Sequence, residues 1–223
     1  MSALELIMVS ESLTRMRIFF SKTASIRFTG HLDLQRTWER TFRRAGLPIA
    51  YRQGFNPQAR LNLALALPLG FTSQCEILDV WFEIPVSIYE LETRLVPALP
   101  AGLEITGFQE IGLSEPALQT QISSAEYHIS LNNPLPELEA HCEKLLQSSS
   151  IIRQWRDKKY DLRPLILELR TLPEEPGGSQ RLFVRLSARE GATGRPEEVA
   201  SALGISPELI RVHRINLAFL ENA

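Results

Sequence analysis

Two periodicities of apolar residues alternate along the chain, one typical of strands and the other typical of helices. Residues 61–67 and 76–84 alternate between apolar and polar side chains, which predicts strands. Residues 31–45 carry apolar side chains at helical spacing, and Gly46 and Pro48 follow, which predicts a helix that ends there. The chain therefore combines strands and helices in close succession, as α+β proteins do.

The predicted elements follow the order of a ferredoxin-like unit, and this order occurs twice. The first set has a strand hairpin or bent strand within 16–30, a helix at 31–45, strands at 61–67 and 76–84, a helix at 86–96 and a strand at 103–111. After a loop at 113–121, the second set has strands at 127–131, 151–155, 165–172, 181–187 and 209–217, one more than the first, and helices at 135–147 and 196–203. We predict an α+β fold of two tandem ferredoxin-like (βαββαβ) units with antiparallel sheets. Residues 16–112 form the N-terminal unit, 122–223 the C-terminal unit, and 1–15 a leader or linker remnant.

Composition and cysteine content are those of a soluble protein from a reducing compartment. The 223 residues are 44% hydrophobic and 22% charged, which is ordinary for a globular protein. Cys75 and Cys142 lie far apart and match no metal-ligand spacing, so two free thiols are expected rather than a disulfide. No apolar run approaches the roughly 20 residues of a membrane span, and Glu5 stands where a signal peptide would carry positive charge. We therefore expect a cytoplasmic protein with no membrane attachment.

Charge is distributed unevenly although the net charge is only −2. Residues 15–60 hold ten Lys/Arg against two Asp/Glu, whereas residues 61–150 hold two against twelve. Such asymmetry is a recognised sign of a face that binds polyanions. Of the 24 basic residues 20 are arginine, whose planar group suits phosphate pairing and base stacking, although a GC-rich genome would give the same bias.

The predicted helix at 31–45 has two different faces. A helical projection places on its apolar face Leu34, Trp38, Phe42 and Ala45. The opposite face carries Arg36, Arg40, Arg43 and Arg44, with Glu39 beside them. Helix arginines ordinarily form a solvated face, but four of them with one acidic neighbour repel one another more than solubility requires. This cluster is therefore a candidate RNA-binding face.

The loop at 51–60 adds aromatic and basic side chains that would follow this helix. Its candidate RNA contacts, by base stacking and phosphate pairing, are Tyr51, Arg52, Phe55 and Arg60. Gly54, Asn56 and Pro57 are expected to set the shape of the loop, with Gly54 at a positive φ. The same composition also fits an ordinary surface loop that is anchored by Phe55.

His31 and Asp33 are the candidates for catalysis. The positive end of a helix favours the neutral form of a histidine placed there, and a neutral imidazole can act as a general base. The alternative is structural: His31 closes the turn and Asp33 complements the helix dipole. The sequence contains no phosphate-binding loop, nucleophile elbow or zinc-binding motif, and we predict no metal site.

Residues 30–76 resemble a known family over a long string. They read GHLDLQRTWERTFRRAGLPIAYRQGFNPQARLNLALALPLGFTSQCE. The resemblance rests on GHLD at 30–33, Arg40, RRAG at 43–46, GFNP at 54–57, PLG at 68–70 and Glu76, with shorter matches at 99–103 and 161–166. This string is similar to the radical-SAM-linked family, a bacterial domain of unknown function, and the resemblance covers nearly everything after residue 15.

Proteins of that family look like partners of a radical SAM enzyme that also carries a cobalamin-binding region. The resemblance implies that the partner holds an iron–sulfur cluster, SAM and cobalamin, and that this chain holds no cofactor. It implies no reaction, because the family has no established activity. Residues 1–15 would be either a translated leader or the stub of a linker to that enzyme.

Three functions remain open. The first is an accessory module that binds RNA and presents it to a radical SAM partner, without being an enzyme on its own. The second is a metal-independent RNA-processing enzyme that uses His31, by analogy with CRISPR-repeat endonucleases of tandem ferredoxin-like fold, although their glycine-rich loop is missing from 206–220. The third is a protein-only scaffold that docks through the acidic segment 61–150. The strand RLFVRLS at 181–187 lacks the aromatic signature of RNA-recognition modules.

Overall fold

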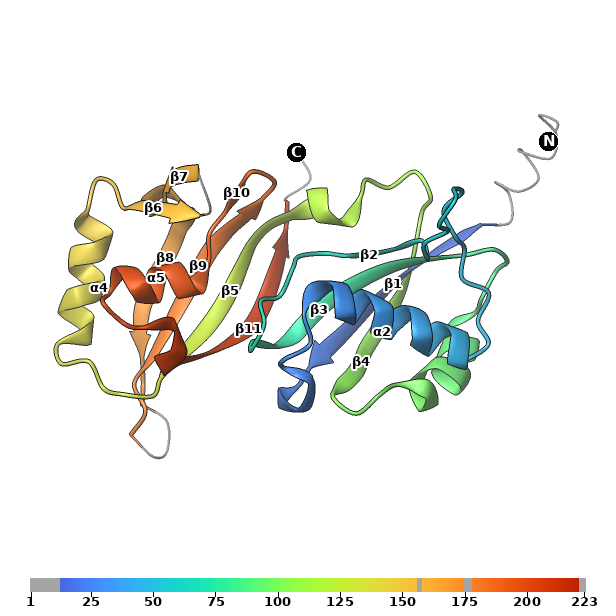
Figure 1. Ribbon diagram of the computed structural model, residues 1–223, viewed down its shortest axis with the longest axis horizontal. Helices are drawn as coiled ribbons and strands as arrows, with labels where there is room; N and C mark the ends of the chain where they lie inside the picture. The colour runs from blue at the N-terminus through green and yellow to red at the C-terminus, as the bar shows by residue number, and fades with distance from the viewer. Residues whose placement is uncertain (1–12, 156–157, 175–177, 221–223) are drawn as a thin grey trace. The chain divides into compact units, whose positions relative to one another are not determined.

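The computed structural model describes residues 13–155, 158–174 and 178–220 (Figure 1). The chain divides into two compact units, of which unit 1 ends at Gln121 and unit 2 begins at Ile122. Unit 1 thus extends past the predicted end at residue 112 and includes the loop at 113–121. Residues 1–12 of the predicted leader lie outside the described residues.

Unit 1 has the strand order β4–β1–β3–β2, with every neighbouring pair antiparallel. Its elements are β1 (Thr14–Lys22), η1 (Ala24–Ile26), α2 (His31–Arg44), β2 (Leu61–Leu63), β3 (Thr72–Phe82), α3 (Ile88–Glu90), η2 (Leu91–Leu95), η3 (Val96–Ala98), β4 (Leu103–Ile111) and η4 (Leu118–Gln121). The strand predicted at 76–84 is β3 and begins earlier, at Thr72, whereas the strand regions predicted within 16–30 and at 61–67 are too long. The second half of the predicted hairpin at 16–30 forms η1, because the backbone N–H groups of Ile26 and Arg27 donate back to Thr23 and Ala24. The strand predicted at 61–67 ends at Leu63, before the turn at 68–70.

The buried face of α2 forms the centre of the unit 1 core. Leu34, Trp38 and Phe42 are buried, as the helical projection predicts. The ring of Trp38 lies 4.8 Å from that of Phe20 on β1, and the ring of Phe42 lies 6.0 Å from that of Phe82 on β3, both edge to face. Each such pair contributes about 0.5–1.5 kcal/mol beyond the burial of its apolar area. These contacts hold α2 in one orientation on the sheet.

The opposite face of the unit 1 sheet carries a buried ion cluster. Arg15 donates to Asp79 Oδ2 at 2.6 Å, and Arg17 donates to Asp79 Oδ1 at 2.8 Å. All three residues are buried. Arg15 also donates to the backbone carbonyls of Glu115 and Pro116. The cluster therefore fastens the loop at 113–121 across this face.

Unit 2 repeats the same arrangement, with the antiparallel strand order β11–β5–β9–β8. Its elements are β5 (Ile122–Leu131), α4 (Leu138–Gln147), β6 (Ile152–Trp155), β7 (Lys158–Asp161), η5 (Arg163–Leu165), β8 (Ile166–Leu172), β9 (Arg181–Arg189), β10 (Ala192–Thr193), α5 (Pro196–Ala202), η6 (Pro207–Leu209) and β11 (Ile210–Phe219). The extra strand predicted at 151–155 is β6, which pairs with β7 in a hairpin inserted between α4 and β8. The predicted α+β fold of two ferredoxin-like units is thus confirmed.

Both cysteines are free thiols, as their spacing predicts: Cys75 is half-buried and Cys142 is buried. Within the described ranges, no helix is both long enough and apolar enough to cross a membrane. The same residues contain no group of three or more His, Cys, Asp or Glu side chains placed to hold a metal ion.

Candidate nucleic-acid interface

The arginine face of α2 is exposed, as the sequence predicts for Arg36, Arg40, Arg43 and Arg44. The helix begins at His31 and ends before Gly46, whose φ of +65° gives the left-handed turn that stops a helix. Asp33 in the first turn and arginines in the last turn complement the helix dipole. The buried face fixes the rotation of α2, so the arginines are presented at defined positions.

Two of these arginines have partners at the C-terminal half of α2. Arg43 is hydrogen-bonded to Tyr51 and donates to Glu39 Oε1 at 2.8 Å, and these partners raise the pKa of its guanidinium above the ordinary value. Arg44 donates to the backbone carbonyl of Ala98. Arg43 therefore ties the helix to the start of the loop at 51–60, and Arg44 ties it to η3.

The other two arginines are better placed to meet a ligand. Arg36 pairs with Asp33 at 3.2 Å, but the two side chains are 67% and 66% exposed. An ion pair so open to water contributes at most about 1 kcal/mol and is readily exchanged. Arg40 is exposed and has no partner among the residues that the structure describes. Arg36 and Arg40 are thus the arginines of this face that a ligand can reach most easily.

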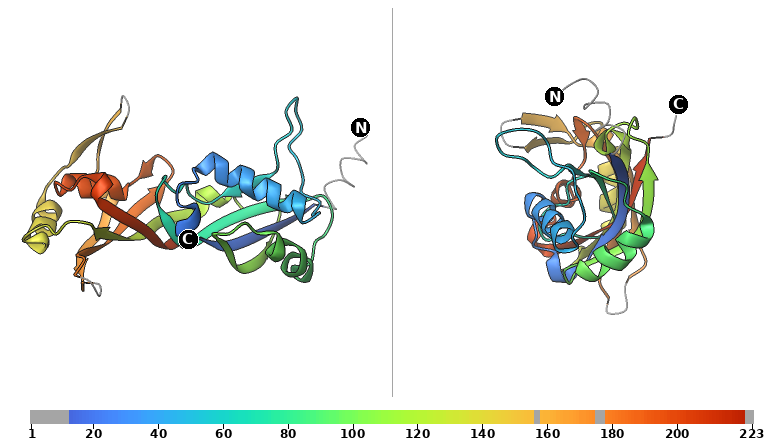
Figure 2. Two further views of the ribbon diagram at one scale, coloured as in Figure 1. Left: turned by 60° about the horizontal axis from the view of Figure 1, so that its bottom comes forward. Right: turned by 90° about the vertical axis from the view of Figure 1, so that its right-hand side faces the viewer.

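The loop at 51–60 projects as a narrow hairpin from unit 1 (Figure 2). Its two sides meet at a bridge between Tyr51 and Ala59. Gly54 near the tip has a φ of +154°, as predicted, in a region that favours glycine. Phe55 is fully exposed, at 101% of its reference area. The alternative in which Phe55 anchors the loop is therefore wrong, because its ring is not buried. Asn56 and Pro57 share the exposed tip.

Arg60, at the base of the loop, packs on the sheet. Its guanidinium lies over the ring of Trp81, 4.8 Å from the ring centre. Burial, followed by the nearby charges of Arg52 and Arg15, lowers the pKa of Arg60 below its ordinary value. The structure thus separates Arg60 from the exposed residues of the loop tip.

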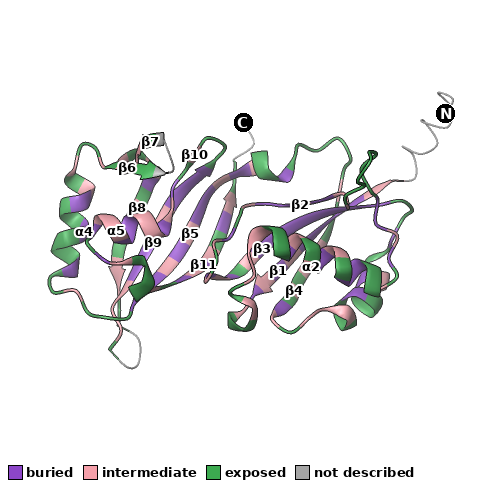
Figure 3. Ribbon diagram, viewed as in Figure 1, coloured by how far each residue is buried: buried purple, intermediate pink, exposed green. Residues whose placement is uncertain are grey.

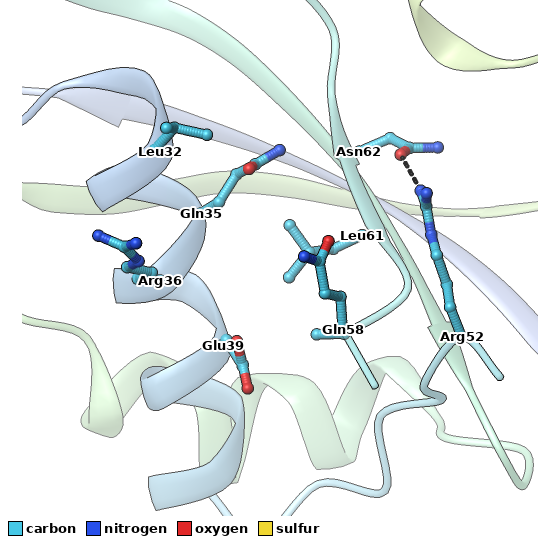
Figure 4. A pocket seen from close by; sticks show the side chains of 9 residues that line it. Leu32, Gln35, Arg36, Glu39, Arg52, Gln58, Leu61 and Asn62 are labelled. Atoms are coloured by element: carbon cyan, nitrogen blue, oxygen red, sulfur yellow. Dashed lines mark hydrogen bonds between the residues drawn. The ribbon is translucent and has the colours of Figure 1, made fainter. Parts of the chain in front are cut away.

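The helix and the loop meet at one pocket of about 370 Å³ (Figure 4). It is lined by Leu32, Gln35, Arg36 and Glu39 of α2 and by Arg52, Gln58, Ala59, Leu61 and Asn62. Arg52 donates to Asn62 Oδ1 at 3.2 Å, which orients its guanidinium along the pocket wall. Two guanidinium groups and three amides at one pocket can pair with a phosphate and with the edge of a base.

Sequence reasoning missed the amides of this pocket, and it singled out two residues that do not line it. Gln35, Gln58 and Asn62 belong to no motif; their spacing to the predicted arginines was the only available signal. His31 is half-buried and Asp33 is exposed, but neither is among the residues that line the pocket. The predicted catalytic pair therefore lies at the helix start, outside the shared pocket.

Two acidic residues of the segment 61–150 are buried in unit 1. Glu76 and Asp79 are buried, and Asp79 is paired with two arginines. The segment also crosses the boundary between the two units at residue 121. Docking of a protein partner through this segment therefore stays a prediction.

Three solved structures are similar to this chain, each at low sequence identity. A chain of a Cbf5–Nop10–Gar1 complex has a TM-score of 0.47 and 11% identity, and the match covers 93% of this chain but 50% of that one. A putative glycine cleavage system transcriptional repressor has a TM-score of 0.25 and 13% identity, with 94% and 99% covered. The acetolactate synthase small subunit from Thermotoga maritima has a TM-score of 0.27 and 8% identity, with 95% and 99% covered. This chain thus spans about half the length of the first. No curated protein matches the sequence.

A family of uncharacterized proteins conserved in bacteria, DUF2344, matches residues 15–196. The match begins in β1 and reaches the start of α5, so it includes the arginine face of α2 and the loop at 51–60. It also spans the boundary between the two units. The chain therefore belongs to the DUF2344 family of bacterial proteins.

Proposed function

We propose that this protein is an accessory module that binds RNA and presents it to a radical SAM partner enzyme. The observation that carries the proposal is the shared pocket of α2 and the loop at 51–60. Arg36 of the helix and Arg52 of the loop both line it. Arg40 continues the exposed charge along α2, and Phe55 offers a fully exposed ring at the loop tip.

The chemistry of this surface suits a flexible polyanion with planar bases. Arg36, Arg40 and Arg52 provide guanidinium groups that pair with phosphate oxygens. Phe55 provides a stacking surface, and base–aromatic stacking contributes about 1–3 kcal/mol per base. The amides of the pocket carry both donors and acceptors, as the Watson–Crick edges of unpaired bases do.

The radical SAM part of the proposal is supported by the sequence resemblance at 30–76. The same segment folds into α2, the loop and β2, and every residue that lines the pocket lies within it. The iron–sulfur cluster, SAM and cobalamin would be held by the partner, and this chain would contribute RNA binding.

The test is a salt titration of RNA binding by the purified full chain. A labelled RNA hairpin with a single-stranded loop is followed by fluorescence anisotropy between about 50 and 200 mM salt, the range over which phosphate-driven binding weakens steeply. The double variant Arg36→Glu/Arg40→Glu should weaken binding by about tenfold or more. It should also reduce the salt slope by roughly 1.4, because each phosphate of a single strand that is no longer neutralised removes about 0.7 from the slope. Phe55→Ala should weaken binding without changing the salt slope.

A matched control carries the same change in net charge elsewhere. Lys144 on α4 and Lys159 on β7 are exposed, so Lys144→Glu/Lys159→Glu should leave RNA affinity close to that of the wild type. Equal decreases in affinity in both double variants would show a net-charge effect, and unchanged affinity in the α2 variant would refute the RNA-binding site. Co-expression with a radical SAM enzyme that carries a cobalamin-binding region tests the partner: absence of a co-eluting complex, with or without RNA, would refute the presentation role.

A further inference from the structure

The sheet of unit 2 has one apolar face and one polar face. Strand β5 alternates between buried and less buried residues from residue 125 to 131 (Figure 3), whereas β9 is buried at every position from 182 to 188 except Arg185. On one face, Leu169, Val184 and Tyr127 are neighbours across β8, β9 and β5, and all three are buried. The alternate residues point to the opposite face, because side chains along a strand alternate in direction. We call this opposite face, which carries Arg170, Phe183, His128 and His213, the polar face.

One row of the polar face runs across all four strands. The register pairs Arg170 of β8 with Phe183 of β9, Phe183 with His128 of β5, and His128 with His213 of β11. Directly opposed residues share a face, with strands about 4.8 Å apart. Every strand of this sheet thus contributes a planar side chain to the same row.

Arg170 is held in a position suited to stacking. Its guanidinium lies over the ring of Phe183, 4.4 Å from the ring centre, and Nε donates to Glu168 Oε1 at 3.1 Å. Phe183 is buried, whereas the side chain of Arg170 is 53% exposed. The ring below and the carboxylate at the edge fix the guanidinium plane, and its outer surface faces solvent. A guanidinium plane presented in this way stacks on nucleic-acid bases.

A second row lies about 7 Å away, two residues further along the strands. It pairs Leu172 with Arg181, Arg181 with Ser130, and Ser130 with Arg211. Arg211 is exposed and, with Ser130, lines a pocket of about 260 Å³. This row supplies guanidinium and hydroxyl groups beside the planar row.

The polar face carries more positive than negative charge. Its arginines are Arg170, Arg181, Arg185 and Arg211, and its acidic residues in the same registers are Glu126 and Glu168. Glu168 pairs with Arg170 at 3.1 Å and with Arg185 at 3.3 Å, so it is largely neutralised. Charge complementarity therefore favours an anionic ligand on this face.

We propose that the polar face of unit 2 binds single-stranded nucleic acid, with bases stacked along the row from Arg170 to His213 and phosphates paired with the second row. This site is separate from the α2 pocket and goes beyond the proposed function. A row of planar side chains next to a row of basic side chains matches a nucleic-acid strand, whose bases and phosphates form two parallel lines. The ligand must be single-stranded, since paired bases do not offer their faces. Phe183 serves this site as the support of Arg170, which explains why β9 needs no exposed aromatic signature.

The test separates the contribution of the planar group at position 170 to binding from the contribution of its positive charge. Arg170→Lys keeps the charge but removes the planar group, so binding of a labelled decauridine RNA should weaken by about tenfold, the scale of one base stack. Arg211→Ala should weaken binding less and should reduce the salt slope by about 0.7. The matched control is Arg94→Lys, an exposed arginine of η2 paired with Glu90, which should bind as the wild type does.

Each measurement is repeated in the Arg36→Glu/Arg40→Glu background, so that failure of the α2 site and failure of the polar face can be told apart. If Arg170→Lys and Arg211→Ala each bind as tightly as their parent protein in both backgrounds, the polar-face site is overturned and the α2 proposal is left intact. Equal competition by double-stranded RNA would also overturn it. A deoxyuridine decamer tests the sugar: equal binding supports single-stranded nucleic acid in general, and weaker binding supports RNA. Circular dichroism confirms that the variants are folded.

Discussion

Replacement of Asp79 by asparagine removes a carboxylate that binds both Arg15 and Arg17 on the covered face of unit 1. Asp79 is fully buried and accepts four hydrogen bonds from the two guanidinium groups, at 2.6, 2.8, 3.1 and 3.1 Å. Asparagine keeps one acceptor, but its amide N–H₂ would face guanidinium donors. Two buried positive charges would then lie side by side without the negative charge of Asp79.

The expected cost follows from the geometry of the cluster. Removal of one partner from a buried ion pair costs about 3–5 kcal/mol, because the remaining charge stays buried. Arg15 retains the carbonyls of Glu115 and Pro116, which places the expected loss of stability for Asp79→Asn near the lower end, at about 3 kcal/mol. This is a large part of the total stability of a small domain.

Urea unfolding followed by tryptophan fluorescence measures this loss. The ring of Trp81 lies 4.9 Å from the Arg15 guanidinium, so its emission reports on the cluster directly. The matched control is Asp33→Asn, which makes the same change at the exposed pair with Arg36 and should alter the free energy of unfolding by less than about 1 kcal/mol. A decrease below about 1 kcal/mol for Asp79→Asn, or equal decreases in both variants, would refute the reasoning.

Two further changes test a titrating group and a backbone conformation. Burial and then the neighbouring His128 lower the pKa of His213, so the unfolded chain binds that proton more tightly; stability is full above about pH 6.5 and falls as the pH drops below it. His213→Gln should make the urea midpoint less dependent on pH between about 7.5 and 5.5, and an unchanged slope would contradict this assignment. Gly54→Val should lower the free energy of unfolding by roughly 1–3 kcal/mol through the backbone alone, because no atom lies within 4 Å of the added Cβ. Equal stability of the valine variant would show that the loop relaxes without cost.

Periodicity was sufficient to predict α2 and the ferredoxin-like order of the main elements in both units, but not the short strands β7 and β10. The alternation of Leu34, Trp38 and Phe42 with arginines fixed which face of the helix is buried, because burial of such large apolar side chains dominates the local energy. The predictions of strands at 61–67 and within 16–30 were less accurate. An apolar run allows a strand but does not require a partner, and the second half of each run has local hydrogen bonds or a turn instead.

Long-range partners explain why much of the candidate site was not predictable. The spacing of Arg43 and Tyr51 contains no sign that they bond, since the interaction depends on how the loop returns after Pro48. Arg60 was grouped with the loop arginines, but it packs over Trp81 of β3. The row from Arg170 to His213 could not be predicted from the sequence either, because it depends on the register of four strands.

The two units share a fold but differ in which face remains available. In unit 1 the loop at 113–121 crosses the face of the sheet opposite α2, and Arg15 binds that loop by its backbone. The proposed contacts of unit 1 therefore lie on the helix side, where arginines of α2 meet the projecting loop. In unit 2 the corresponding face keeps Arg170 and Arg211 exposed, so the sheet itself can meet a ligand. The two proposed binding surfaces thus differ although the order of elements is the same, because a loop and a buried ion cluster cover the sheet face of unit 1.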